Sequence, residues 1–145
     1  PNGATIEREL RFDISAQNEL RLALRNPDLF KSVSAFSPIV SPLNCRWGDK
    51  AMTAYLGADR DAWRGHDACA LIEDGKGAQF DEILIDQGLA DQFLATQLHP
   101  HLFESACAQA GQPLTLRRHA GYDHGYYFVQ TFLADHLQHH ASALA

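Results

Sequence analysis

The first part of the chain changes its pattern of apolar and polar residues near residue 18. Between Thr5 and Ser15, apolar side chains at alternate positions are separated by threonine and charged residues. This period of two predicts a β-strand with one buried face. From Asn18 to Arg25, three leucines stand among good helix formers. They predict a short helix that ends before Pro27, because proline disfavours helical geometry in the residue before it.

Short apolar runs and longer helix-forming runs then alternate to the end of the chain. The expected strands are Ser32–Val40, Glu82–Ile85 and Leu114–Arg117. The expected helices are Lys50–Leu56, Asp59–Leu71, Asp91–Ala110 and Tyr126–His140. Pro100 should break or restart the third of these helices. The alternation over the second half predicts an α/β fold with right-handed crossovers, in which helices flank a small, mostly parallel sheet of about four strands.

Composition limits the class of protein. The 145 residues are 46% hydrophobic and 21% charged, typical of one soluble globular domain without a membrane-spanning segment. A net charge of −6 disfavours nucleic acids and anionic membranes as partners. The basic pair Arg117–Arg118 is expected at a solvated strand edge. The sparse cysteines Cys45, Cys69 and Cys107 suggest free, partly buried thiols and a cytoplasmic location, with neither a disulfide framework nor a zinc site.

Two polar loops follow predicted strands, Asp86–Phe93 and Gly121–Phe128. In parallel sheets, ligand chemistry sits at the carboxyl ends of the strands, so the two loops should meet there. An acid in one such loop and a histidine in the next supply two members of a Ser-His-Asp triad. The third member is normally a serine in a Gly-x-Ser-x-Gly turn, a motif that this sequence does not contain.

Longer motifs keep a fixed order and spacing along the chain. They are Leu22–Phe30, Ser34–Val40, Pro42–Cys45, Tyr55–Asp59, Ile83–Gly88, Ala90–Phe93, Gly111–Arg117 and Gly121–His124. On these motifs the sequence resembles the S-formylglutathione hydrolases, the esterase D family of serine α/β-hydrolases. The resemblance begins near Leu22 and covers about 120 of the 145 residues. It implies a partial α/β-hydrolase fold.

The resemblance also implies roles for individual residues. The catalytic acid of the family matches Asp91, and its catalytic histidine matches His124. Trp47 lies in the segment Cys45–Gly48, which matches a family loop near the acyl site and carries Arg46 where the family has proline. The implied activity is thioester or ester hydrolysis of S-formylglutathione or short acyl esters, used in formaldehyde detoxification. No cofactor and no metal are implied.

The sequence departs from the family pattern at its beginning. Family members are roughly twice as long, and residues 1–20 occupy the place of the serine turn, whereas residues 21–145 match the C-terminal half. We therefore expect the chain to be inactive on its own. The alternative is a non-catalytic, truncated or rearranged fragment that acts as a folding or assembly scaffold, and a weaker one is a binding protein with a glutathione or acyl pocket. An uncovered parallel strand edge would favour a homo-oligomer or a complementary fragment.

Several other residues have simpler interpretations. Asp91 could instead cap the helix that follows it, and Asp86 and Asp123 are expected to be structural acids. Ser15 is a weak candidate for a replacement nucleophile, as is a cysteine paired with His124. Ser37 and Ser41 are interpreted as ordinary loop or strand serines. Five histidines that could resemble metal ligands are instead expected to be solvated residues near helix ends: His99, His101, His136, His139 and His140.

Overall fold

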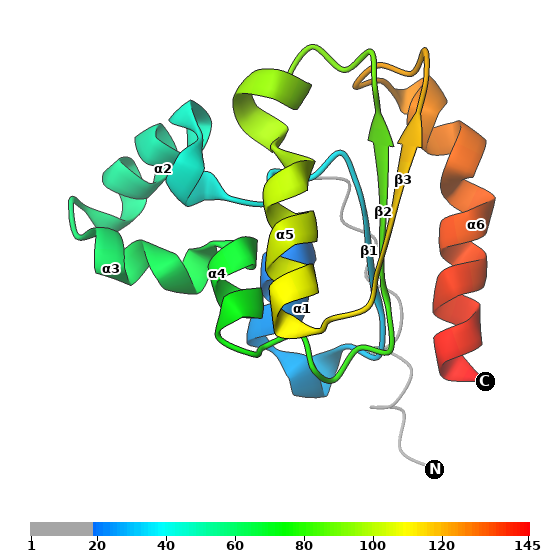
Figure 1. Cartoon of the computed structure of the whole chain (residues 1–145), viewed down its shortest axis with the longest axis horizontal. Coiled ribbons are helices and arrows are strands. Elements are labelled where there is room, and N and C mark those ends of the chain that lie inside the picture. Colours follow the sequence, from blue (N-terminus) through cyan, green and yellow to red (C-terminus); the bar gives the residue numbers. More distant parts are fainter. Residues whose placement is uncertain (1–18) are drawn as a thin grey trace.

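The computed structural model describes residues 19–145. Three parallel strands form one sheet in the order β1-β2-β3: β1 (Val33–Phe36), β2 (Ile83–Gly88) and β3 (Leu114–His119) (Figure 1). In this register Ile85 pairs with Ala35 on one side and with Leu116 on the other. The predicted α/β class and parallel sheet are confirmed with three strands. The further strand expected over Thr5–Ser15 lies outside the described residues, as does most of the proposed atypical segment 1–20.

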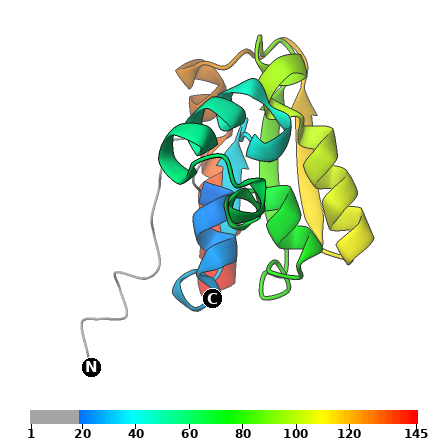
Figure 2. The same cartoon turned by 90° about the vertical axis from the view of Figure 1, so that its left-hand side faces the viewer.

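Helices cover both faces of this sheet. They are α1 (Glu19–Arg25), α2 (Arg46–Leu56), α3 (Arg60–Trp63), α4 (Ala68–Glu73), α5 (Pro100–Ala110) and α6 (Tyr126–Leu144). Shorter helical turns lie at Pro27–Leu29, Pro42–Asn44, Arg64–His66 and Leu94–Leu98. Figures 1 and 2 show α1, α4 and α5 on one face and α6 alone on the other, while α2 and α3 extend away from the sheet. No helix among residues 19–145 is long and apolar enough to cross a membrane.

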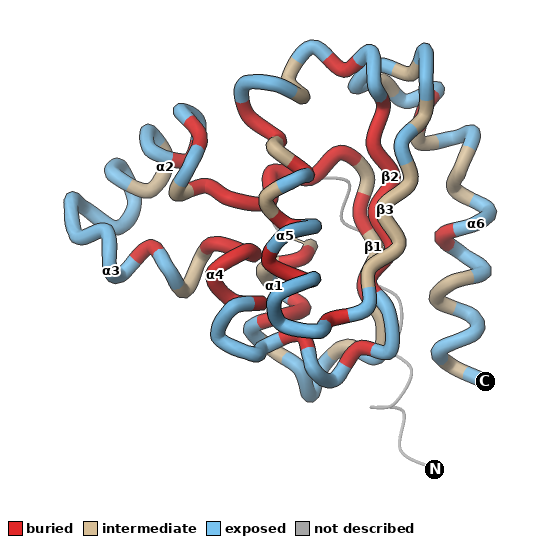
Figure 3. The backbone as a smooth tube through the Cα atoms, viewed as in Figure 1, coloured by how far each residue is buried: buried red, intermediate tan, exposed pale blue. Residues whose placement is uncertain are grey.

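The main core lies between the sheet and the layer of α1, α4 and α5. Leu24, Ile83, Ile85 and Phe103 are fully buried there. Every residue of β2 is buried, as expected for a central parallel strand covered on both faces (Figure 3). The three cysteines are free thiols, as expected, and all are buried rather than partly buried.

Two predicted helices are interrupted in the structure. The run Asp59–Leu71 divides into α3, a short helical turn and α4, because the carboxylate of Asp67 caps α4 by accepting the backbone N–H of Ala70 at 3.0 Å. The run Asp91–Ala110 is not one helix. A π-helical turn ends at Leu98, His99 adopts φ 48°, and α5 begins at Pro100, where a missing N–H breaks no helical hydrogen bond.

Candidate active site

An aspartate and a histidine meet where β2 and β3 end. Asp91 follows β2 and His124 follows β3, so the parallel pairing of these strands brings their loops to the same edge of the sheet. His124 Nδ1 lies 2.7 Å from Asp91 Oδ2. The carboxylate is fully buried, whereas the imidazole side chain is 33% exposed. The arrangement therefore presents one face of the ring to solvent while its other end is anchored in the protein.

The Asp91 carboxylate is held by three donors. Its Oδ1 accepts the backbone N–H of Phe93 at 2.8 Å, and its Oδ2 accepts both His124 Nδ1 and Gln87 Nε2, the latter at 3.3 Å. The contact with Phe93 is local, but Asp91 does not cap a helix, because the helical turn Leu94–Leu98 has Phe93 at its N-cap and no side-chain capping hydrogen bond. Because Nδ1 is bound to the carboxylate, Nε2 is the ring nitrogen of His124 that can exchange a proton with a ligand.

Backbone contacts tie the two loops together. Ala90 donates its N–H to the carbonyl oxygen of Tyr122 at 2.9 Å, and Leu89 donates to His119 at 2.9 Å. A Cβ atom added to Gly88 would lie 2.3 Å from the Tyr122 carbonyl oxygen, so only glycine permits this close approach. The position of His124 relative to Asp91 therefore depends on main-chain geometry as well as on the hydrogen bond between the two side chains.

Aromatic rings extend from the histidine toward the surface. The ring of Phe93 meets that of His124 edge to face, with 5.3 Å between centroids. The ring of Trp47 lies next, with 4.7 Å between its centroid and that of Phe93. The backbone of Trp47 is fixed because Gln97 Oε1 accepts its N–H at 3.0 Å. Trp47 is 40% exposed. Phe93 therefore lies between Trp47 and His124, and the exposed ring of Trp47 is a surface that a bound molecule could contact.

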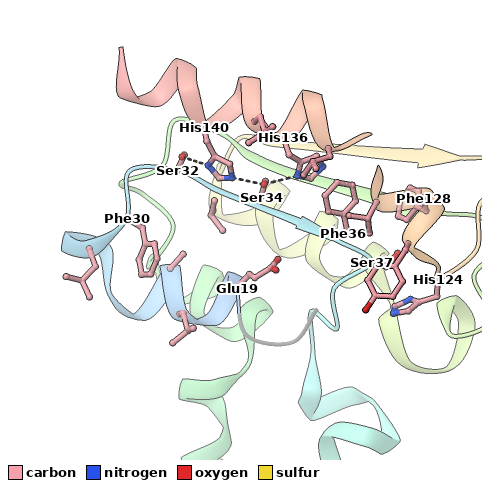
Figure 4. Close-up of a pocket in the computed structure, with 18 of the residues that line it drawn as sticks. Glu19, Phe30, Ser32, Ser34, Phe36, Ser37, His124, Phe128, His136 and His140 are labelled. Carbon is pink, nitrogen blue, oxygen red and sulfur yellow. Dashed lines mark hydrogen bonds between the residues drawn. The ribbon is translucent and has the colours of Figure 1, made fainter. Parts of the chain in front are cut away.

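A cavity of about 1040 Å³ begins at His124 and runs between α1, β1 and α6. Figure 4 shows Ser37 and His124 together at one end, with His136 and His140 farther along it. Apolar side chains such as Phe36 and Leu133 form much of the wall. No group of three or more potential metal ligands in residues 19–145 is arranged to hold a metal ion.

A buried polar cluster beneath this cavity corrects two expectations. His136 is 1% exposed, and its Nε2 lies 3.1 Å from Asp86 Oδ2. It is not a solvated helix-end residue. Arg117 is not part of a purely solvated edge either, because its Nε donates to Asp86 at 2.6 Å and its Nη1 pairs with Asp135. His119 is the third side chain bound to Asp86, at 3.1 Å. Asp86 is a structural acid, as expected.

Asp86 remains ionised inside this cluster. Burial opposes its charge, but hydrogen bonds from His136, Arg117 and His119 outweigh burial and hold the pKa of Asp86 well below its usual range. The same hydrogen bond to Asp86 raises the pKa of Arg117. A buried carboxylate with these cationic and N–H partners joins β2, β3 and α6 into one unit.

A line of hydrogen bonds leads from Asp86 along the cavity wall. His136 Nδ1 lies 2.8 Å from Ser34 Oγ, which lies 2.9 Å from His140 Nε2, and His140 Nδ1 lies 2.7 Å from Ser32 Oγ. With both imidazoles neutral, each hydroxyl donates to an Nδ1 and each Nε2–H donates onward, ending at Asp86. Burial is the main cause that lowers the pKa of His140 to about 4, helped by His139 and His136. His140 is therefore another residue wrongly expected to be solvated.

The sequence matches known esterases over most of its length. A family model described as "Putative esterase" matches residues 17–139. The S-formylglutathione hydrolase of Arabidopsis thaliana is 54% identical over 125 residues, covering 86% of this chain and 44% of the relative. That of Bos taurus is 51% identical over 123 residues, covering 84% of this chain and 43% of the relative. The chain thus spans less than half the length of the curated relatives it matches.

Solved structures agree with these matches. An S-formylglutathione hydrolase from Agrobacterium tumefaciens superposes with a TM-score of 0.84 and 49% identity, covering 98% of this chain and 54% of that one. The serine hydrolase FphF from Staphylococcus aureus gives a TM-score of 0.67 at 18% identity and covers 85% of this chain and 49% of that one, which supports the fold alone. The three-stranded parallel sheet and its helices therefore correspond to part of a hydrolase fold.

Proposed function

The chain belongs to the esterase family, and we propose that it acts as part of a thioesterase that hydrolyses S-formylglutathione or a similar short-acyl thioester. The supporting observation is the 2.7 Å contact between His124 Nδ1 and the buried Asp91 carboxylate. The similarity to S-formylglutathione hydrolases supports the choice of substrate. The aromatic wall of Phe93 and Trp47 beside the histidine supports binding of the acyl group or the thiol portion.

In the proposed reaction, His124 moves protons and Asp91 positions it. Nε2 takes the proton of an attacking hydroxyl while the oxygen forms a bond to the thioester carbonyl carbon. When the carbon–sulfur bond breaks, the imidazolium returns the proton to the departing thiolate. Water then attacks the carbonyl carbon of the ester formed on that hydroxyl, and Nε2 takes its proton. The bond between the acyl carbon and the hydroxyl oxygen breaks, the imidazolium returns the proton to that oxygen, and formate or another short acid leaves. Asp91 accepts Nδ1–H throughout and stabilises the charged ring.

The identity of the attacking hydroxyl determines whether these 145 residues turn over substrate alone. The sequence holds no Gly-x-Ser-x-Gly turn, and no serine among residues 19–145 is hydrogen-bonded to His124. We therefore expect little hydrolysis by the isolated chain. The same observation favours the second candidate, a non-catalytic fragment that assembles with another chain.

A fluorophosphonate probe and an S-formylglutathione assay test both candidates. A single adduct by intact mass, or hydrolysis above background, should disappear in His124→Gln and persist in His101→Gln, an exposed control on α5. Hydrolysis that survives His124→Gln would contradict the proposed site. A folded chain with no adduct and no hydrolysis, alone or mixed with a complementary fragment, would instead favour the scaffold.

The outer edge of β1 is the feature that favours assembly with a partner. Within residues 19–145, β1 pairs with β2 alone, and the cavity runs along β1 between α1 and α6. A strand edge with unpaired backbone groups favours addition of another strand. We therefore expect a homo-oligomer or a complex with a complementary fragment. Light scattering over a range of concentrations checks this, and a monodisperse monomer at every concentration would contradict it.

A further inference from the structure

Ser37 has an unusual backbone conformation at the end of β1. Its φ is 44°, in the left-handed region that residues other than glycine rarely adopt. Its backbone N–H donates to the carbonyl oxygen of Asp86 at 2.9 Å, which continues the pairing of β1 with β2. The residue is therefore fixed by the sheet in a strained conformation. Strain of this kind is found most often where a side chain must be held in a particular place for function.

The hydroxyl of Ser37 is also unusual, because it is buried without a partner. Ser37 is 3% exposed, and its Oγ makes no hydrogen bond to any of residues 19–145. Other buried or half-buried serines nearby are satisfied: Ser41 Oγ donates to Asp67 Oδ2 at 2.7 Å, and Ser34 Oγ lies between two histidines. Buried polar groups in folded proteins nearly always have a partner, so this hydroxyl needs a reason to be exempt.

The location of Ser37 supplies that reason. It lines the same cavity as His124, and Figure 4 places the two residues at the same end. Among the serines of the cavity wall, Ser32 and Ser34 are bound to His140 and His136, whereas Ser37 Oγ is buried and has no partner among the described residues. No lysine or arginine from the described part of the chain lines the cavity. A neutral acceptor therefore suits this end of the cavity better than a carboxylate does.

We propose that Ser37 Oγ donates a hydrogen bond to the carbonyl oxygen of a bound acyl thioester and so holds the acyl group beside His124. The choice of substrate class rests on the proposed function. Ser37 is then a substrate-contacting residue and not the nucleophile, because no hydrogen bond joins it to His124. The left-handed backbone fixes the position of the hydroxyl, and a bound carbonyl would supply the hydrogen-bond partner that Oγ lacks.

Two thioethers that resist hydrolysis separate this role from general packing. S-acetonylglutathione carries a ketone carbonyl in the group attached to sulfur, and S-isobutylglutathione has a group of similar shape there with a methyl in place of the ketone oxygen. In calorimetry of the full chain, Ser37→Ala should weaken binding of the acetonyl probe by about three- to tenfold, the effect of one hydrogen bond. Binding of the isobutyl probe should change less than about twofold. Ser37→Gly, which accepts the left-handed backbone, should show the same selective loss, and Ser105→Ala on the exposed face of α5 should show none.

Unfolding provides a readout that does not depend on a ligand. Ser37→Ala removes a buried, unpaired hydroxyl, so its midpoint in urea should equal or exceed that of the wild type. A lower midpoint would overturn the proposal, because the hydroxyl would then support the fold. Equal weakening of both probes, or a fluorophosphonate adduct on Ser37, would also overturn it. Failure of the wild type to bind either probe would refute the proposed substrate class, and the urea midpoints would still decide whether the fold needs the hydroxyl.

Discussion

Asp86 and His136 bind each other across the boundary between the sheet and α6, with 3.1 Å between Oδ2 and Nε2. Asp86 belongs to the central strand β2, and His136 lies in the middle of α6, the single helix on its face of the sheet. The His136 ring also stacks on Phe36, with 3.8 Å between centroids. The attachment of α6 to the sheet therefore combines a charged hydrogen bond with ring packing.

His136→Phe separates these two contributions. Phenylalanine can keep the stacking on Phe36 but cannot bind Asp86 or Ser34. We expect a loss of about 1–3 kcal/mol in the free energy of unfolding, because the buried carboxylate loses one of its donors. Urea denaturation followed by circular dichroism measures the loss. The exposed Gln138→Ala on the same helix should stay within about 0.5 kcal/mol of the wild type, and an equal loss there would point to helix propensity instead.

His140 should make stability depend on pH in the weakly acidic range. Its pKa is lowered to about 4 in the folded protein, mainly by burial, whereas an unfolded histidine titrates near 6.5. The unfolded chain therefore takes up a proton first, and stability falls as pH decreases from about 6.5 to about 4, by at most about 3 kcal/mol. Urea midpoints across this range should show the slope, and His140→Gln should flatten it.

Asp86 should make stability depend on pH in a lower range than His140 does. Its folded pKa lies well below the usual value, so the stability it contributes is present above about pH 4 and is lost only as pH falls further. The loss below pH 4 should therefore persist in His140→Gln. A single transition shared by both ranges and abolished by His140→Gln would contradict this separation.

Gly88→Ala should displace the loop that carries His124. The added Cβ would meet the Tyr122 carbonyl oxygen at 2.3 Å, and a backbone atom cannot move aside as a flexible side chain can. We expect lower stability by about 1–3 kcal/mol together with changed amide chemical shifts at residues 121–124. Gly65→Ala is the matched control, because nothing lies within 4 Å of its added Cβ. Unchanged shifts at 121–124 in Gly88→Ala would show that the contact between the loops is not restrictive.

Asp91→Asn tests the positioning of His124 without a large change in shape. The amide can still accept the Phe93 N–H, but it holds the Nδ1–H tautomer poorly. Imidazole ¹⁵N shifts should show less proton on Nδ1, a result that requires no turnover. Where S-formylglutathione is hydrolysed, the rate should fall by about 10³–10⁴-fold. Asp123→Asn, an exposed position in the loop that carries His124, should leave both readouts unchanged.

Much of the fold can be predicted from local patterns. The apolar runs that became β1, β2 and β3 are short, are bounded by polar or turn residues, and alternate with helix-forming runs, so their type and order are clear. Helix boundaries are less predictable where a capping side chain or a proline starts a new helix inside a run of helix-forming residues. Asp67 ends one predicted helix by capping the next, and Pro100 begins α5 after His99 turns into the left-handed region. The partners of these residues are not visible in a local pattern.

The candidate site can also be predicted only in part from local sequence. Asp91 and His124 can be expected together because each follows a strand, and parallel strands end at one edge. The polarity of His136 and His140 predicts solvated residues, and this prediction is wrong because their positions on α6 place them against the sheet. They continue the series Phe128 and Phe132 at steps of four residues, so they share the buried stripe of α6. The strain and unpaired hydroxyl of Ser37 arise from tertiary packing, and no sequence pattern signals them.

The buried thiols make the chain suitable for labelling at a single site. Burial raises the pKa of all three cysteines, that of Cys107 to about 12, so they react slowly with maleimides at neutral pH. Lys76 lies in an exposed turn that precedes β2, whereas His124 follows the parallel strand β3, so the two residues are at opposite ends of the sheet. Lys76→Cys would therefore accept a fluorophore or a surface linker alone, and ligand binding at the far end could be followed on a molecule held in one orientation.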